Sequence, residues 1–468
     1  EPQINWYDHP VRVGTAPEHN EILYGLRHLD RALAWEVARG RAPGALRMPC
    51  VLSVSVTHAG LHAVARPYIE RELARAGGLR HLEVHVVTEA DTRRLAEALA
   101  PLAGGGAAAA GMAEVLGVDG AYGRHYSFLK AVAALWQACV DPAVRATFKI
   151  DLDQVFPQET LEREAGGSMF ELFGTPLWGA TGVDADGEPV ELGLIAGALV
   201  NERDIARGLF TPDVPFPAAA PAMDERVFWS RLPQALSTEA EMMTRYGAAE
   251  MDGRTACLQR IHVTGGTNGI LVDALRRHRP FTPSFFGRAE DQAYLLSTFR
   301  APGPRLGYLH RPGLIMRHDK EAFAGDAIRA ARTGTAIGDY VRILQFSAYA
   351  ALCGGVDAVK ARIDPFTGCF VSRMPRAVTL LRFGLAAAAA FERADGDAPA
   401  FVQSGCARLA GAMAFTDPSD GTMDRRVTLE RNGWTAFFDS LDAAGRPDAG
   451  GIRDAVRAIL ADCRIRTA

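Results

Sequence analysis

The sequence predicts an α/β protein with helical segments at both ends. Two short apolar runs, at residues 50–56 and 82–87, are each followed by residues at helical spacing. Strand–helix–strand–helix order at this spacing favours a parallel sheet with helices packed on it. The C-terminal part of the chain has helical pattern without convincing strands. We therefore expect an N-terminal helical arm (residues 1–45), an α/β domain (46–330) and a C-terminal helical region (331–468).

The composition is that of an ordinary globular protein. Of 468 residues, 48% are hydrophobic and 23% are charged, and the formal net charge is −4. These values exclude a mostly disordered or collagen-like chain. The lack of a broad cationic field argues against nucleic acid or an anionic membrane as a partner.

The cysteines and the apolar runs indicate where in the cell the protein is expected. Seven scattered cysteines without a C-x-x-C pair are typical of reduced thiols. No uncharged apolar run reaches the ~18 residues that a membrane span needs. We expect a cytoplasmic protein without a transmembrane segment, and the excess of arginine over lysine is typical of a bacterium with a GC-rich genome.

The first elements follow from local patterns. Apolar residues at helical spacing predict a helix at residues 18–39, and each of the two early strands leads into a helix. The low-complexity run at residues 104–111 (GGGAAAAG) is expected as a surface loop. An apolar helix at residues 127–140 carries Lys130 and ends before a proline. The next strand, residues 146–150, runs directly into two aspartates.

A long segment separates this strand from the next motif. It includes a proline-rich stretch at residues 211–221, which predicts an irregular loop. We interpret residues 180 to about 255 as an insertion in the α/β domain. A glycine-rich turn at residues 265–269 then precedes a predicted amphipathic helix at residues 270–277. Glycines in such a turn let a ligand approach the backbone closely.

The main candidate site is the carboxylate pair Asp151 and Asp153 at the end of the strand 146–150. Ligands of open α/β sheets bind at the carboxyl ends of strands, and alternate side chains of an extended segment point the same way. Crowded carboxylates repel each other, and a bound divalent cation removes that repulsion. Mg²⁺ typically binds one or two carboxylates together with phosphate oxygens, so the pair predicts metal-assisted chemistry on a phosphate ester. The alternative is a strand-end turn in which an aspartate caps the next segment.

Further motifs lie downstream. Glu290 and Asp291 stand near a predicted helix start, where a carboxylate can also act simply as a cap. His318 follows an apolar run and could bind a metal ion, with His310 as an alternative ligand, although a single histidine more often packs in the core. Trp178 flanks the insertion and is a candidate for stacking on a bound ligand.

Over residues 48–320 the order of these parts resembles nucleotide-sugar-dependent glycosyltransferases of the GT-A fold, most closely the large inverting family 2 type. The matching parts are the early strand, a second strand ending in acidic residues, a lysine-bearing helix, the D-x-D pair, the Gly-Gly turn, the Glu290–Asp291 pair and a late histidine. The resemblance implies a Rossmann-like mixed sheet flanked by helices. It also implies a Mn²⁺ or Mg²⁺ cofactor, a UDP- or GDP-sugar donor, and a carbohydrate or other hydroxyl-bearing acceptor.

The resemblance also implies a role for each matching residue. Asp153 and Asp151 would bind the metal ion, with His318 completing its ligands, and Asp291 would be the general base that takes a proton from the acceptor hydroxyl. The implied nucleotide-binding residues are Thr57, His58, Glu89, Asp91, Arg124, Lys130 and Asp151. The implied donor and acceptor pocket consists of Gly265, Gly266, Thr267, Asn268, Glu290 and Trp178. A homodimer is compatible with this interpretation.

Departures from the family keep other functions open. The first strand lacks the usual proline-containing ending, and the Q-x-x-R-W signature of processive synthases is missing after Asp291. A retaining GT-A enzyme would also use Asp153. A haloacid-dehalogenase-like phosphatase would use Asp151 as its nucleophile. A sugar nucleotidyltransferase and a non-catalytic binding or scaffolding protein are the remaining alternatives.

Overall fold

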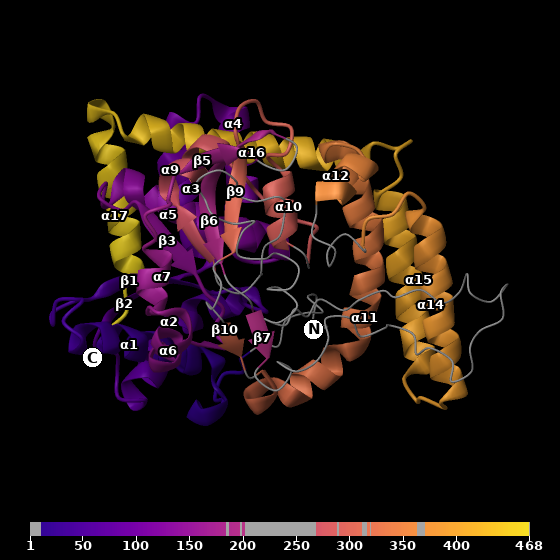
Figure 1. The fold of residues 1–468 in the computed structure, drawn as a ribbon, viewed down its shortest axis with the longest axis horizontal. Helices are drawn as coiled ribbons and strands as arrows, with labels where there is room; N and C mark the ends of the chain where they lie inside the picture. The colour runs from indigo at the N-terminus through magenta and orange to yellow at the C-terminus, as the bar shows by residue number, and fades with distance from the viewer. Residues whose placement is uncertain are drawn as a thin grey trace.

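Helices dominate the chain and surround small β-sheets (Figure 1). The computed structural model describes residues 11–183, 187–196, 199–201, 268–287, 290–310, 316–318, 320–362 and 370–467. Within these ranges the protein is a mixed α/β structure with a helical C-terminal region, as the sequence predicts. The finer assignment to the GT-A fold stays a prediction.

The first α/β unit has the order that the sequence predicts. β1 (Met48–Ser53) and β2 (Leu82–Val87) are parallel and pair along their whole length. α2 (His62–Arg75) connects them, and α3 (Glu89–Leu99) follows β2. β2 has the predicted range, whereas β1 begins and ends earlier than predicted.

The strand that leads to the aspartate pair belongs to a second sheet. In the described residues this sheet has five strands: β3 (Ala146–Lys149) at one edge, then β8 (Asn268–Leu271), β6 (Pro189–Ala196) and β5 (Thr181–Val183), with β9 (Arg305–His310) also paired to β6. Only the β6–β9 pair is parallel. The sheet is therefore mixed, as the resemblance implies. The parallel sheet expected from the strand–helix order is wrong for this sheet as a whole, although β1–β2, β6–β9 and β10–β7 are parallel pairs.

The predicted insertion is partly built into the sheet. Its first described residues form β5 and β6, and β6 is buried over nearly its whole length. Its later part, including the proline-rich stretch 211–221, lies outside the described residues. The helix predicted at residues 270–277 begins two residues late as α9 (Val272–His278), because residues 270 and 271 pair with β3 and complete β8.

A short third sheet lies beside the aspartate pair. It consists of β4 (Gln154–Val155), β10 (Met316–His318) and β7 (Leu199–Asn201), with β10 in the middle. β10 is antiparallel to β4 and places His318 opposite Gln154. This pairing brings the backbone of the late histidine next to the turn that follows β3.

The run at residues 104–111 is not a surface loop, so that prediction is wrong. α4 (Gly106–Val115) includes most of it, because alanine has the highest helix propensity. Gly111 packs directly against Gly433 of α16 (Thr422–Ala444), where a Cβ on Gly111 would lie 3.6 Å from the Gly433 Cα. The glycines therefore serve a close approach of two helices.

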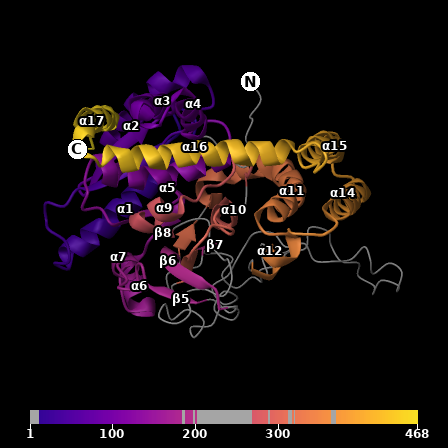
Figure 2. The same ribbon diagram turned by 90° about the horizontal axis from the view of Figure 1, so that it is seen from above.

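The C-terminal helices form two groups. α11 (Lys320–Cys353), α12 (Val356–Arg362), α14 (Pro375–Glu392) and α15 (Ala398–Phe415) lie together at one side of the molecule (Figure 1). α16 runs from this group across the α/β part, and α17 (Gly450–Cys463) packs on α3 and β2 (Figure 2). The remaining elements are η1 (Pro17–His19), α1 (Glu21–Ala38), η2 (Ala59–Leu61), η3 (Ala100–Leu102), α5 (Tyr122–Cys139), α6 (Gln158–Ala165), α7 (Met169–Phe173), α10 (Glu290–Leu296) and η7 (Pro447–Ala449). Among the described helices, none is both long enough and apolar enough to cross a membrane.

α1 agrees closely with the helix predicted for the N-terminal arm, and it supports the aspartate turn. Its Gly25 faces the backbone of Leu152, the residue between the two aspartates. A Cβ at Gly25 would lie 2.5 Å from the Leu152 carbonyl oxygen and 2.7 Å from its Cα. Because these are backbone atoms, no side-chain rotation can relieve the contact.

We expect Gly25→Ala to destabilise the protein by roughly 1–3 kcal/mol, the usual cost of overpacking. Inside a helix alanine is normally more stable than glycine by ~1 kcal/mol, so a loss of stability would mean that the clash outweighs this preference. Urea unfolding measures the free energy. The control is Gly411→Ala in α15, where nothing lies within 4 Å of the added atom, and it should be stabilised. A stabilised Gly25→Ala would contradict the packing of α1 on the aspartate turn.

Candidate functional site

The aspartate pair lies in a turn after β3. The Gln154 amide donates to the Asp151 carbonyl at 3.3 Å, and the Asp151 amide donates to the Gln154 side chain at 3.2 Å. The backbone is therefore not extended here, so the argument that an extended segment points both carboxylates the same way does not hold. The turn that the sequence left as an alternative describes the local backbone.

The two carboxylates have different surroundings. The Asp151 side chain is 35% exposed and pairs with the ammonium group of Lys149, whose side chain is 4% exposed. Asp153 is 1% exposed. Asp151 is therefore the member of the pair that a ligand can reach in this conformation, and Lys149 brings a positive charge to the same place.

A buried polar cluster lies behind this turn. Lys130 of α5 donates to the Asn268 side chain at the start of β8, and its Nζ is 3.8 Å from Oδ1 of Asp291 in α10. Asn268 also donates to that oxygen, at 3.5 Å. All three side chains are at most 3% exposed. The cluster thus joins three elements that are far apart in the sequence.

Two tyrosines line the cluster. The Lys130 ammonium lies 4.6 Å from the Tyr126 ring centre and 4.8 Å from the Tyr294 ring centre, within the range of cation–π attraction. The Lys149 ammonium lies 5.5 Å from the same Tyr126 ring. Tyr126 therefore contacts both lysines and connects the buried cluster with the aspartate turn.

Burial controls the ionisation of this cluster. Loss of water raises the pKa of Asp291 well above its ordinary value, because desolvation disfavours the carboxylate. The same loss lowers the pKa of Lys130 well below its ordinary value, and the charge of Lys149 lowers it further. Buried groups with perturbed pKa values concentrate at functional sites, although structural networks perturb them too.

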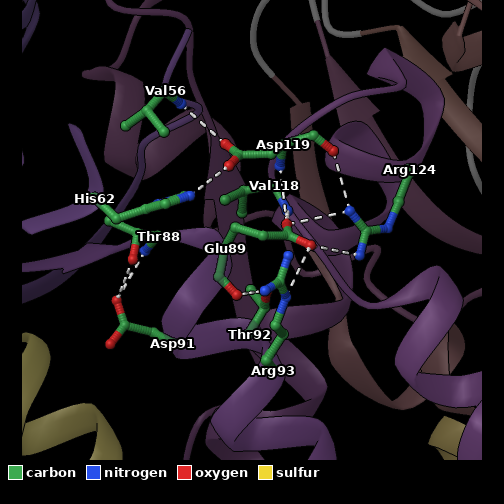
Figure 3. Close-up of polar contacts among 10 residues, drawn as sticks. All are labelled: Val56, His62, Thr88, Glu89, Asp91, Thr92, Arg93, Val118, Asp119 and Arg124. Atoms are coloured by element: carbon green, nitrogen blue, oxygen red, sulfur yellow. Dashed lines mark hydrogen bonds and ion pairs between the residues drawn. The ribbon is translucent and has the colours of Figure 1, made fainter. Parts of the chain in front are cut away.

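A second polar network lies at the carboxyl ends of β1 and β2 (Figure 3). Glu89 accepts hydrogen bonds from the amides of Val118 and Asp119, at 2.9 and 3.0 Å, and from both terminal nitrogens of Arg124. Asp119 accepts from the Val56 amide at 2.9 Å and pairs with His62 at 3.1 Å. The network ties the loop after β1 to the start of α3 and to α5.

His125 lies near charged members of both networks. Its Nε2 lies 2.5 Å from the hydroxyl of Ser53 at the end of β1. Burial, with the nearby charges of Lys149 and Arg124, lowers the pKa of His125 to about 4. The imidazole is therefore neutral at pH 7. The ends of β1 and β3 thus converge on one polar region.

The structure brings several predicted site residues together. Lys130, Asn268 and Asp291 form one cluster, and Glu89 pairs with Arg124. His318 has its backbone beside the aspartate turn. Gly265, Gly266 and Thr267 lie outside the described residues.

Other predicted residues are further from this region or have local partners. Asp91 closes the capping box of α3 with Thr88 and pairs with Arg66 at 2.8 Å. His58 and Thr57 contact each other at 2.9 Å on the exposed loop after β1. Trp178 donates to the Phe173 carbonyl at 2.7 Å and packs beside Gly269. Glu290 lies in the first turn of α10, and its carbonyl accepts from Thr282.

Sequence reasoning missed several members of the site. They are Ser53, His62, Asp119, His125, Tyr126, Lys149 and Tyr294. Lys149 had a visible signal, since it stands two residues before Asp151 in a chain with few lysines. The others lie on helices and loops whose contacts depend on tertiary packing. Among the described residues, no three His, Cys, Asp or Glu side chains are arranged to hold a metal ion.

We expect Glu89→Gln to lower stability at pH 7 by roughly 1–3 kcal/mol, because buried donors would lose a charged acceptor. Burial alone favours the neutral acid, but the hydrogen bonds from Arg124 and from the Asp119 and Val118 amides leave the pKa of Glu89 lowered. Its stabilisation is therefore present above the ordinary carboxyl pKa and is lost as the pH falls through the lower folded value.

The melting-temperature difference between Glu89→Gln and wild type should shrink as the pH falls below about 4. Glu97→Gln, an exposed change on the same helix, should differ little from wild type at any pH. A Glu89→Gln difference that stays constant with pH would contradict the role given to the charge.

Comparison of the chain with protein-family models, with curated proteins and with solved structures found no match in any of the three.

Proposed function

We propose that the chain is a metal-dependent glycosyltransferase that moves a sugar from a nucleoside-diphosphate sugar to an acceptor hydroxyl, with inversion. The observation that supports it best is the placement of two kinds of acid in one region. Asp151 lies partly exposed beside Lys149 at the end of β3, and Asp291 lies in the buried cluster connected to it through Tyr126. The transfer needs one group near a diphosphate and another near a hydroxyl.

The donor set fits Mn²⁺ or Mg²⁺ only together with a substrate. Asp151 offers a hard oxygen ligand that is open to solvent, and the register of β10 brings the His318 backbone close. Asp153 is 1% exposed, so it could bind the same ion only after the turn rearranges. The described residues supply no third ligand by themselves, so diphosphate oxygens and water would fill the other positions. The negative charge on the leaving diphosphate would be neutralised by the bound cation, a contribution of several kcal/mol.

Lys149 has a role of its own in this proposal. Its ammonium already pairs with Asp151, so it limits the repulsion within the acidic turn before a ligand arrives. When the diphosphate binds, the same ammonium can shift toward a phosphate oxygen, since lysine acts as a flexible point charge. Asp151 would then be free to hold the cation.

Asp291 is the proposed general base. Burial raises the pKa of its carboxyl, and this direction makes the carboxylate a stronger base than an exposed aspartate. Lys130 and Asn268 both approach the same oxygen, Oδ1. They orient the carboxylate so that Oδ2 can accept the proton of the acceptor hydroxyl. Lys130 is thus a positioning residue in this proposal, because its ammonium contacts Asn268 and Asp291. Asp291 is itself only 3% exposed, so a movement must open a path from the acceptor hydroxyl to Oδ2.

The network of Glu89 and Asp119 is the proposed support of the nucleotide pocket. Glu89 is fully engaged by Arg124 and by two amides, so its effect on a nucleotide is to position the loop at residues 118–119. Asp119 and His62, each about a fifth exposed, are closer to solvent. They offer an acceptor and an imidazole to a nucleoside bound at the ends of β1 and β2.

The first test is a thermal-shift panel of nucleoside diphosphates and nucleotide-sugars with Mn²⁺, with Mg²⁺ and with a chelator. A ligand at 100 times its dissociation constant stabilises the folded state by ~2.7 kcal/mol, so the matching nucleotide should raise the melting temperature and lose that effect with the chelator. Asp153→Asn and Asp151→Asn should lose the metal-dependent part. Glu97→Gln is the matched control and should keep it.

Two results would contradict the proposal. One is a panel in which no nucleotide or nucleotide-sugar shifts the melting temperature with either metal ion. The other is metal-dependent release of phosphate from simple phosphomonoesters that disappears in Asp151→Asn, which would favour the phosphatase alternative.

The second test concerns Asp291. We expect Asp291→Asn to lower kcat for transfer by about 10²- to 10⁴-fold, the usual contribution of a general base, with donor binding largely unchanged. Because a buried ionised carboxylate is costly at pH 7, the neutral amide should not unfold the protein, and the melting temperature checks this. A variant that folds and keeps near-full activity would exclude Asp291 as the base and with it this inverting mechanism.

A further inference from the structure

α14 has one face packed in the molecule and another face in water. Thr379, Arg382, Phe383 and Ala390 are buried against the neighbouring helices. On the opposite side, Leu380 is 54% exposed and Phe391 is 56% exposed. Ala377, Gly384 and Ala388 are exposed as well. Large exposed apolar side chains that gather on one face mark an interaction site more often than isolated ones do.

These residues form one stripe along the helix. Their spacings of three and four residues place Ala377, Leu380, Gly384, Ala388 and Phe391 on the same side. α14 itself lies at the outer edge of the described helices, because α14 and α15 are the described helices farthest from the sheets in both views (Figures 1 and 2). A partner can therefore approach α14 without meeting the described sheets.

The stripe matches the same stripe on an antiparallel copy of the helix. A row of residues four apart runs through the stripe and extends beyond both of its ends. It consists of Arg376, Leu380, Gly384, Ala388 and Glu392. When this row is turned end to end about Gly384, Leu380 meets Ala388 and Arg376 meets Glu392. Ala377 similarly meets Phe391. Each large residue is thus opposite a small one, and each charge is opposite the other sign.

This complementarity fits a known packing geometry. Rows of residues four apart interdigitate in the commonest class of helix–helix packing in globular proteins. A twofold axis requires a surface that matches itself, in which residue i contacts j and j contacts i. At the centre, nothing lies within 4 Å of a Cβ added to Gly384, so two helix backbones can come close there.

The charges at the two ends of the row are available for such a contact. Arg376 donates through Nη2 to Asp417 at 2.9 Å and to the Met413 carbonyl at 3.2 Å. Its side chain is still 50% exposed, and Nε and Nη1 can donate elsewhere. Glu392 is exposed at the last position of α14. Ion pairs at the rim of an interface set its register more than its affinity.

We propose that α14 docks antiparallel on α14 of a second copy of this chain, around a twofold axis at Gly384. Arg376 of each copy faces Glu392 of the partner subunit, and Leu380 and Phe391 are covered. This assembly is independent of the proposed enzymatic activity, so either proposal can fail without the other.

The first experiment is a charge exchange followed by sedimentation velocity over a range of protein concentrations. We expect wild type to dimerise and Glu392→Arg to weaken the dimer at least tenfold in dissociation constant. Arg376→Glu should weaken it similarly, and the double variant Arg376→Glu/Glu392→Arg should restore much of the affinity. Glu97→Arg, the same charge change on an exposed position of α3, should leave the dimer unchanged.

Three outcomes would overturn the proposal. The first is a wild-type protein that stays monomeric at all concentrations. The second is a dimer whose dissociation constant is unchanged by either single substitution. The third is a double variant that dimerises no more tightly than the weaker of the two single variants. Because Arg376 also contacts Asp417, melting temperatures must show that each variant is folded. Leu380→Asp, which changes an exposed side chain, gives a second disruption that does not affect that contact.

The second experiment locates the axis. In a Cys406→Ser background, which removes the exposed cysteine of α15, Gly384→Cys should form a covalent dimer on mild oxidation, since only a residue on the axis meets its own copy. Gly411→Cys, at an equally open glycine of α15, should stay uncrosslinked. No crosslink at position 384, or equal crosslinking at both positions, would exclude this axis.

Discussion

A buried ammonium group joins the central elements of the molecule. Lys130 of α5 donates to Asn268 of β8 and lies close to Asp291 of α10. Taking an ammonium and a carboxylate out of water costs several kcal/mol for each ion, so these groups are tolerated only while their partners stay in place. A displacement of β8 or α10 would leave a charge without its partner. The contacts of Lys130 thus couple the positions of α5, β8 and α10 to one another.

The same contact separates the acids of the region into two kinds. Asp151 keeps a lysine beside it and access to water, whereas Asp291 is enclosed and its carboxyl pKa is raised. Two acidic groups in such different surroundings let one site offer an anion in one place and a proton acceptor in another. Tyr126 contacts both Lys130 and Lys149, so the surroundings of Asp151 and of Asp291 adjoin each other. A chemistry that handles a charged leaving group and a hydroxyl together needs this division.

Local patterns predicted most elements but not their pairing. Residues 18–39, 82–87 and 146–150 were identified because helical spacing and short apolar runs are visible without tertiary information. The mixed sheet was not predicted from periodicity, since strand direction depends on which distant strand pairs with β3. The run at residues 104–111 was misjudged because its glycines indicated a loop, while its alanines and the contact with Gly433 favour a helix. Asp151, Asp153 and Asp291 were identifiable as acids at element ends. Their different burial was not, because it comes from α1, α5 and β8.

Residues 464–467 cover one edge of β2, a strand that lies much earlier in the chain. Ile465 donates its amide to the Val84 carbonyl at 3.0 Å, and the Thr467 carbonyl accepts from the Leu79 amide at 2.5 Å. β2 therefore has β1 on one side and this late segment on the other. Contacts between residues so distant in sequence slow folding, and an unpaired strand edge can pair with other molecules. A nascent chain would therefore leave that edge of β2 uncovered until residues 464–467 have been synthesised, and for that time the edge could pair with other molecules.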